Sequence, residues 1–166
     1  MDLADLDELM ARTEITDVLL RYVRGADRAD WDLVRSCYHP DATDDHGLYR
    51  GDVDGLIGFL TALAGALDST SHHLSPPLIV VDGDDARSEA YCIGSYTRSR
   101  RGGGTTLVCQ GVRYLDRLER RSGRWAISTR VVVHDWERVF IDGESAPPDS
   151  WQRGARGSDD PSSTFM

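Results

Sequence analysis

The feature that most constrains the fold is a change of hydrophobic period near residue 68 of the 166-residue chain. Before this point, apolar residues recur every three or four positions, as they do on one face of an amphipathic helix. Beyond it, apolar and polar residues alternate, as they do in strands that bury one face. The sequence therefore predicts an α+β fold in which the helices come first and most of the strands follow.

Three helices are expected before the change of period. The first covers about the first 25 residues and loosens at Gly25, because glycine favours a helix end. The second is short, with Asp30 as its N-cap and Tyr38 on its apolar face, and it ends at Pro40. The third spans residues 53–67 and buries one apolar face.

Extended segments are expected after the change, at residues 71–74, 78–81, 86–98, 105–120 and 124–139. The last three are long, and turns rich in glycine separate them, which indicates an antiparallel meander that bends around the helices. Farther on, the composition shifts to Gly, Ser, Pro and Asp. We therefore expect a domain over residues 1–141 and a flexible C-terminal tail over residues 142–166.

Length and composition indicate a single globular domain. With 40% hydrophobic and 28% charged residues, a chain of this length can bury one core. Its first residues are acidic, and no apolar run approaches the roughly 20 residues of a membrane span, so we expect a cytoplasmic protein that does not bind membranes. The net charge of −9 argues against nucleic acid as a partner.

The basic residues exclude several kinds of chemistry. All nineteen are arginine, and the chain has no lysine. A Schiff base, a pyridoxal phosphate linkage and a Walker A phosphate loop each need a lysine, so all three are excluded. The glycines at positions 102–104 lie in a strand turn and not at a helix start, so they are not a dinucleotide-binding fingerprint.

Metal binding is not expected either. The three cysteines lack CxxC spacing, which argues against a zinc site or a disulfide framework. A denser group of ligand-type residues is interpreted as a solvated polar face; it comprises His39, Asp41, Asp44, Asp45 and His46. The sequence therefore predicts a protein without a metal or another cofactor.

Several segments resemble the SnoaL-like family of the nuclear-transport-factor-2-like superfamily in order and spacing. They lie between about residues 5 and 137 and comprise residues 22–31, His39–Ala42, Thr70–Leu74, Tyr114–Arg117 and Gly123–Ile127. The resemblance implies a cone-shaped barrel, in which a curved, mainly antiparallel sheet wraps around three helices and encloses a pocket. It also implies a homodimer, because the convex sheet face of this fold often mediates dimers.

This family includes scytalone-dehydratase-like enzymes, bile-acid dehydratases, a dehydrochlorinase and polyketide cyclases, as well as many proteins with no known activity. The fold alone therefore assigns no function. In the dehydratase-like members an aspartate of the first helix and the first histidine of the Thr-x-His-His segment form a catalytic pair. The resemblance places these roles on Asp27 and His72.

The chemistry of such a pair is independent of the family. A neutral imidazole can remove a proton near a carbonyl at pH 7. A carboxylate on the other ring nitrogen fixes the tautomer and stabilises the imidazolium that forms. The structural alternative is a surface Asp27 at a helix end and a His72 that is simply hydrogen-bonded within its strand.

His73 must point to the opposite strand face from His72, and the family pattern favours His72 as the residue that faces the pocket. The resemblance also implies two electrophilic helpers: Tyr22 as a hydrogen-bond donor and Arg130 as a site for a leaving group or carboxylate. Tyr22 meets Asp27 only if the helix ends or bends between them, because five residues turn it by about 140°. The alternatives are a core tyrosine and an arginine paired with a structural carboxylate.

Further candidate substrate contacts are His46, Tyr96, His134 and Trp136, with His73 as a less favoured one. His46 falls where the dehydratase-like members have a pocket tyrosine. His134 and Trp136 have the parity of Arg130 in their strand, so the three are expected on one wall. For each of these residues, the alternative to a substrate contact is a purely structural role in packing.

Together these residues predict a cofactor-independent lyase or isomerase: a dehydratase, double-bond isomerase or cyclase acting on a small apolar carbonyl-containing or polyketide-like substrate. Two alternatives remain open. One is a non-catalytic ligand-binding or interaction module, in which Asp27 and His72 lie apart. The other is an epoxide-opening hydrolase or cyclase with paired carboxylates, which predicts a second buried acid beside Asp27, chosen from Asp44, Asp45 and Asp116.

Overall fold

The computed structural model describes residues 3–142, 150 and 152–164. The helices are α1 (Leu3–Arg28), α2 (Trp31–Ser36) and α3 (Val53–Gly65), with the short 3-10 helices η1 (Gly157–Asp159) and η2 (Pro161–Thr164) near the C-terminus. The strands are β1 (Tyr38–Asp45), β2 (Arg50–Asp52), β3 (Ser69–Leu74), β4 (Leu78–Asp82), β5 (Asp85–Ser99), β6 (Thr105–Arg121) and β7 (Arg124–Asp142). None of the helices in these residues is long and apolar enough to cross a membrane.

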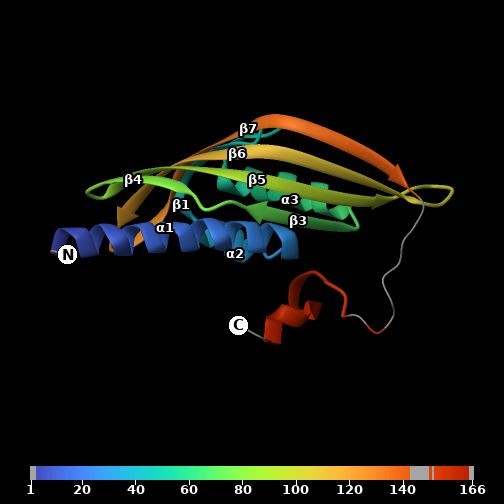
Figure 1. Cartoon of the computed structure of the whole chain (residues 1–166), viewed down its shortest axis with the longest axis horizontal. Coiled ribbons are helices and arrows are strands. Elements are labelled where there is room, and N and C mark those ends of the chain that lie inside the picture. The colour runs from blue at the N-terminus through green and yellow to red at the C-terminus, as the bar shows by residue number, and fades with distance from the viewer. Residues whose placement is uncertain (1–2, 143–149, 151, 165–166) are drawn as a thin grey trace.

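The strands form one sheet in the order β2-β1-β7-β6-β5-β3, with β4 paired to β5. The pair β1–β7 is parallel and the other pairs are antiparallel. The long strands β5, β6 and β7 arch over the helices (Figure 1). The α+β class and the curved, mainly antiparallel sheet are therefore confirmed, although the sheet stays open instead of closing into a barrel.

The core lies between the concave face of the sheet and the helices. Helix α1 buries a stripe at three- and four-residue spacing, made of Ala11, Ile15, Val18, Leu19, Tyr22 and Val23. Helix α3 adds Val53, Leu56, Leu60 and Ala64. Apolar burial of this kind contributes about 25 cal/mol per Å². It fixes α1 against β3 and β7, and thereby sets the position of the C-terminal end of α1.

Helix α1 does not loosen at Gly25 as expected, but continues to Arg28. The glycine serves the packing of α1 on α2. A Cβ at position 25 would lie 2.9 Å from Val34 Cγ2 and 3.1 Å from the Asp30 carbonyl oxygen. The residue that leaves the helical conformation is Ala29, whose φ is 54°.

The expected N-cap of α2 is confirmed, because Asp30 Oδ1 accepts a hydrogen bond of 3.0 Å from the backbone N–H of Leu33. The expected end of α2 at Pro40 is wrong. The chain already changes direction at Cys37, and Tyr38 begins β1. Pro40 lies where the register of β1 against β7 shifts, and there its missing N–H costs no ladder hydrogen bond.

The described part of the C-terminal tail packs against the domain. Arg156 donates hydrogen bonds of 2.7 Å and 3.2 Å to the carbonyl oxygens of Ala64 and Leu67, at the end of α3. Asp160 forms an ion pair of 3.2 Å with Arg28, at the end of α1. Residues 143–149, 151, 165 and 166 of the predicted tail lie outside the described residues, and the flexibility of the tail stays a prediction.

Candidate functional site

The structure brings Asp27 and His72 together. Asp27 lies in the last turn of α1, and His72 is in the middle of β3. His72 Nδ1 is 2.6 Å from Asp27 Oδ1, and the backbone N–H of His72 donates to Asp27 Oδ2 at 3.0 Å. Both side chains are about nine-tenths buried, with 11% of Asp27 and 10% of His72 exposed. One carboxylate therefore holds both the ring and the backbone of the histidine.

These contacts keep the Asp27 carboxyl ionised at neutral pH. Burial raises the pKa of the Asp27 carboxyl, but the hydrogen bonds and the charge of His72 outweigh this effect, so the pKa lies below its usual value. An ionised carboxylate accepts hydrogen bonds only, so His72 Nδ1 carries a proton. The carboxylate leaves the other ring nitrogen, Nε2, for other contacts.

Tyr96 is the phenol that faces this nitrogen. Its hydroxyl is 3.3 Å from His72 Nε2, and the two rings meet edge to face with their centroids 5.7 Å apart. Gly94, the partner of His72 across β3 and β5, makes this possible, because a Cβ there would lie 2.5 Å from the Tyr96 hydroxyl. Burial raises the pKa of Tyr96 to about 12, so the hydroxyl keeps its proton at neutral pH.

His73 points away from the pair. Its side chain is exposed, and its Nε2 is 3.4 Å from the hydroxyl of Ser71. The alternation of strand side chains thus turns His72 toward α1 and His73 toward solvent. Of the two neighbouring histidines, His72 is the one that the fold places against Asp27.

Tyr22 and Arg130 form a separate, fully buried group that does not contact the pair. Both Arg130 and Asp116 have no exposed side-chain surface, and Arg130 Nε and Nη2 donate to the Asp116 carboxylate at 2.7 Å and 2.8 Å. The guanidinium carbon lies 4.0 Å from the centre of the Tyr22 ring and 4.4 Å from that of Tyr114. Burial raises the pKa of the Tyr22 hydroxyl. Arg130 thus has the carboxylate partner that the structural alternative requires.

The other acidic candidates do not accompany Asp27. Asp44 and Asp116 are buried, but Asp44 contacts His46 and Tyr38, and Asp116 contacts Arg130. Asp45 pairs with Arg50 at the surface. Among the contacts of the described residues, no second carboxylate stands beside Asp27, so the arrangement does not match paired carboxylates.

His134 and Trp136, both expected on one wall with Arg130, lie on opposite faces of β7. The register of β6 and β7 shifts between the pairs Gly111–Trp136 and Val112–His134. His134 keeps the parity of Arg130, but the extra residue turns Trp136 to the convex face, where its indole covers Gly111. The expectation that Trp136 shares a wall with Arg130 is therefore wrong, because a bulge breaks the alternation.

Apart from the contact between Asp44 and His46, the ligand-type residues around β1 have separate partners. His39 Nε2 is 2.9 Å from the carbonyl oxygen of Glu119, and Asp41 pairs with Arg121. In the part of the chain that the structure describes, no three His, Cys, Asp or Glu side chains are grouped as a metal site requires.

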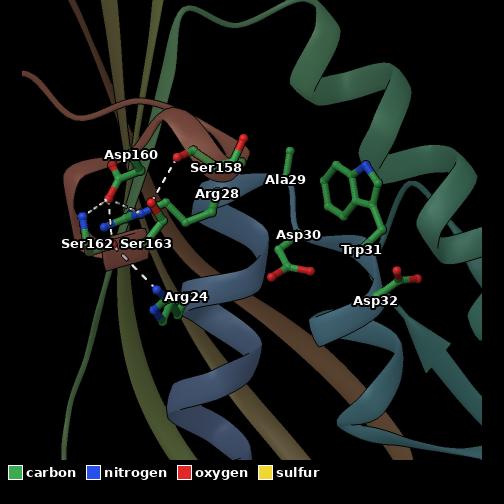
Figure 2. A pocket seen from close by; sticks show the side chains of 11 residues that line it. Arg24, Arg28, Ala29, Asp30, Trp31, Asp32, Ser158, Asp160, Ser162 and Ser163 are labelled. Atoms are coloured by element: carbon green, nitrogen blue, oxygen red, sulfur yellow. Dashed lines mark hydrogen bonds and ion pairs between the residues drawn. The ribbon is translucent and has the colours of Figure 1, made fainter. Parts of the chain in front are cut away.

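A cleft of about 620 Å³ separates the end of α1 and the start of α2 from the C-terminal segment. Figure 2 shows Arg24 and Arg28 on the side of this segment, and Asp30, Trp31 and Asp32 on the other. The lining is largely polar and does not include Asp27 or His72. This cleft is therefore not a pocket of the histidine pair.

Comparison with known families agrees with this architecture. The family model described as a SnoaL-like domain matches residues 7–131. The chain belongs to the SnoaL-like family. This membership confirms the resemblance noted in the sequence. No curated protein sequence matches the chain.

Solved structures share the SnoaL-like fold of this chain at low identity. The hexachlorocyclohexane dehydrochlorinase LinA type 3 from Novosphingobium barchaimii has 19% identity and a TM-score of 0.75, over 87% of this chain and 99% of that one. A protein described as a candidate scytalone dehydratase from Novosphingobium aromaticivorans has 15% identity and a TM-score of 0.69, over 88% and 97%. The β subunit of a candidate aromatic-ring-hydroxylating dioxygenase from the same organism has 20% identity and a TM-score of 0.62, over 78% and 92%. These likenesses establish the fold.

Sequence reasoning missed two residues that shape the site. The sequence did not show that the Tyr96 ring occupies the space over Gly94. This role of Gly94 depends on its pairing with His72 across the sheet. Asp44 was considered as part of a solvated polar face and as a possible second acid beside Asp27, yet it is buried and binds His46. The spacing Asp-x-His within an extended segment was a usable signal, since it places both side chains on one strand face.

Proposed function

We propose that this chain is a cofactor-independent lyase or isomerase that acts on a small, mostly apolar molecule carrying a carbonyl group. The observation that carries the proposal is the contact of 2.6 Å between Asp27 and His72, with Nε2 of the ring left for chemistry. A carboxylate–imidazole pair of this kind suits removal of a weakly acidic proton near neutral pH. The absence of lysine from the chain agrees with a reaction that forms no Schiff base.

In the proposed mechanism, His72 Nε2 takes a proton from carbon next to the substrate carbonyl. Asp27 keeps the ring in one tautomer and stabilises the imidazolium that results. The Tyr96 hydroxyl, 3.3 Å from Nε2, donates to the substrate oxygen as negative charge develops on it. The enolate then loses a leaving group, moves its double bond or closes a ring. A dehydratase, an isomerase and a cyclase share this first step.

The relatives favour elimination among these outcomes. The structures of similar fold include a hexachlorocyclohexane dehydrochlorinase and a candidate scytalone dehydratase, and both names describe eliminations. The chain is therefore proposed to release water or another small leaving group from its substrate.

The test uses variants of the pair. Native protein, Asp27→Asn and His72→Gln are compared on a panel of β-hydroxy ketones, by enone absorbance. We expect each substitution to lower kcat by about 10²- to 10⁴-fold, the usual contribution of a general base. Ligand binding, measured by calorimetry, should change only a few fold in Asp27→Asn. His73→Gln should keep its activity, because that side chain is exposed on the other face.

Full activity of Asp27→Asn would exclude the pair as the catalytic unit. Native protein that binds these ketones without turning any of them over would instead indicate a binding module. Activity that depends on His73 and not on His72 would move the base by one residue.

A further inference from the structure

Thr70 is a polar side chain beside the histidine pair that the proposed mechanism does not use. In β3, exposed and half-buried residues alternate, and Thr70 and His72 both belong to the half-buried set. The two side chains therefore point to the same side of the strand. Across the sheet, Thr70 pairs with Tyr96, just as His72 pairs with Gly94. Thr70 is thus a neighbour of His72 along the strand and of Tyr96 across it.

The Thr70 hydroxyl lies beside a strong acceptor. Its Oγ1 is buried and has no hydrogen-bond partner within the described residues. Burial raises the pKa of the Asp27 carboxyl, whereas the hydrogen bonds and charge of His72, followed by the nearby Thr70 hydroxyl, lower it. A buried hydroxyl without a partner is costly, and an ionised carboxylate is a stronger acceptor than a neutral group. Asp27 is therefore the acceptor that suits this hydroxyl best.

The Asp27 carboxylate has room for a further donor. A carboxylate offers about four acceptor positions. Within the described residues, both of its hydrogen bonds come from His72, one from the ring and one from the backbone N–H. The ring bond changes during proton transfer, because the imidazole then gains a charge. A donor outside that ring would hold the carboxylate independently of it.

We infer that Thr70 is a positioning residue, whose hydroxyl donates a third hydrogen bond to the Asp27 carboxylate and holds it against His72 during proton transfer. The kinetic part of this inference rests on the proposed function. The hydroxyl acts through Asp27 and not on the substrate. It limits the rotation of the carboxylate, so that the carboxylate still faces Nδ1 as the imidazolium forms. Its removal therefore lowers kcat and leaves KM nearly unchanged.

The kinetic test uses two variants that separate the hydroxyl from the methyl group. Thr70→Val removes the hydroxyl and keeps the branched shape, whereas Thr70→Ser keeps the hydroxyl. On the β-hydroxy ketones, we expect Thr70→Val to lower kcat by about tenfold and to leave KM within about twofold, as for loss of one hydrogen bond to a charged group. Thr70→Ser should stay within about threefold of the native protein. The matched control is Ser71→Ala, which removes a hydroxyl from the exposed face of the same strand and should change neither constant.

A double-mutant cycle of unfolding free energies tests the contact without any turnover. Native protein, Thr70→Val, Asp27→Asn and the double variant are unfolded in urea at neutral pH. If the hydroxyl donates to Asp27, Thr70→Val lowers the free energy of unfolding, and lowers it less when Asp27 is already replaced. If the hydroxyl has no partner, Thr70→Val is neutral or stabilising in both backgrounds, because an unsatisfied buried group is removed. That result would overturn the inference.

The kinetic results also decide the role. Full activity of Thr70→Val would overturn the positioning role, even if the cycle shows a contact. An equal loss in Thr70→Ser would overturn it too, because the methyl group and not the hydroxyl would then be required. If the native protein turns over none of the ketones, the proposed function fails, and the unfolding cycle alone decides whether Thr70 holds Asp27.

Discussion

At the residue scale, the site depends on which of two neighbouring histidines the fold turns inward. His72 and His73 are chemically identical, and strand geometry requires that they face opposite sides. His72 is held because Asp27 accepts hydrogen bonds from both its ring and its backbone N–H. A single aspartate at a helix end therefore fixes the orientation, the tautomer and the electrostatics of the candidate base.

The pKa of Asp27 predicts a pH-dependent contribution to stability. Since the pKa in the folded protein lies below the usual 3.8, the contribution is fully present above pH 3.8 and is lost as the pH falls through the lower folded value. Native protein should therefore exceed Asp27→Asn in free energy of unfolding at neutral pH, and the difference should shrink below pH 3.8. Urea unfolding across this range measures it. A difference that stays constant with pH would contradict an ionised, His72-bound Asp27.

At the element scale, one glycine and one β-bulge determine how neighbouring elements pack. Helix α1 passes over α2 where Gly25 leaves room for Val34 and for the Asp30 carbonyl. In the sheet, the bulge in β7 determines which side chains face inward. It turns Trp136 to the convex face, while His134 keeps the inward parity. The glycine and the bulge therefore each change the packing that a regular helix or strand pattern would predict.

Gly25→Ala tests the packing of α1 on α2. Alanine is the better helix former by about 1 kcal/mol, but its Cβ would lie 2.9 Å from Val34 Cγ2, and overpacking costs about 1–3 kcal/mol. We expect a net loss of stability in urea unfolding. The matched control is Gly58→Ala in α3, where a Cβ meets nothing within 4 Å and should stabilise the protein. Equal stabilisation by both substitutions would show that the α1–α2 contact does not require glycine.

At the scale of the whole molecule, the convex face of the sheet leaves apolar surface uncovered. Its exposed side chains include Leu78, Val80, Tyr91, Ile93, Val131, Trp136 and Phe140. A groove of about 380 Å³ runs between Leu78, Val80, Leu115 and Val131. Contiguous apolar surface of this kind marks an interaction site. We propose that a second copy of the chain covers it.

Val131→Arg tests this dimer. A charge in the middle of an apolar interface is costly when it has no partner, so the variant should sediment as a monomer while the native protein sediments as a dimer. The fold of the variant is checked by circular dichroism. A native protein that remains monomeric at micromolar concentration would exclude the convex face as a dimer interface.

Local pattern by itself determined much of this protein. The change of period near residue 68 gave the order of helices and strands, and the Asp30 cap of α2 was readable from its position alone. The resemblance of short segments indicated the family and named Asp27 and His72 as partners. The order of the elements and the cap depend on side-chain periodicity and on neighbours within a few residues, which the linear sequence records directly. The Asp27–His72 partnership was implied by the family resemblance alone.

Only the tertiary structure decided the rest. Arg130 and Tyr22 belong to a buried group around Asp116, because the pairing of β6 with β7 sets their surroundings. Tyr96 reaches His72 only through the space over Gly94, and Asp44 serves His46 and not Asp27. The contacts of Arg130 with Asp116 and of Tyr96 with His72 join residues far apart in the chain, and a bulge of a single residue reverses which face a side chain occupies. The sequence contains the participants, and the register of the strands determines which of them meet.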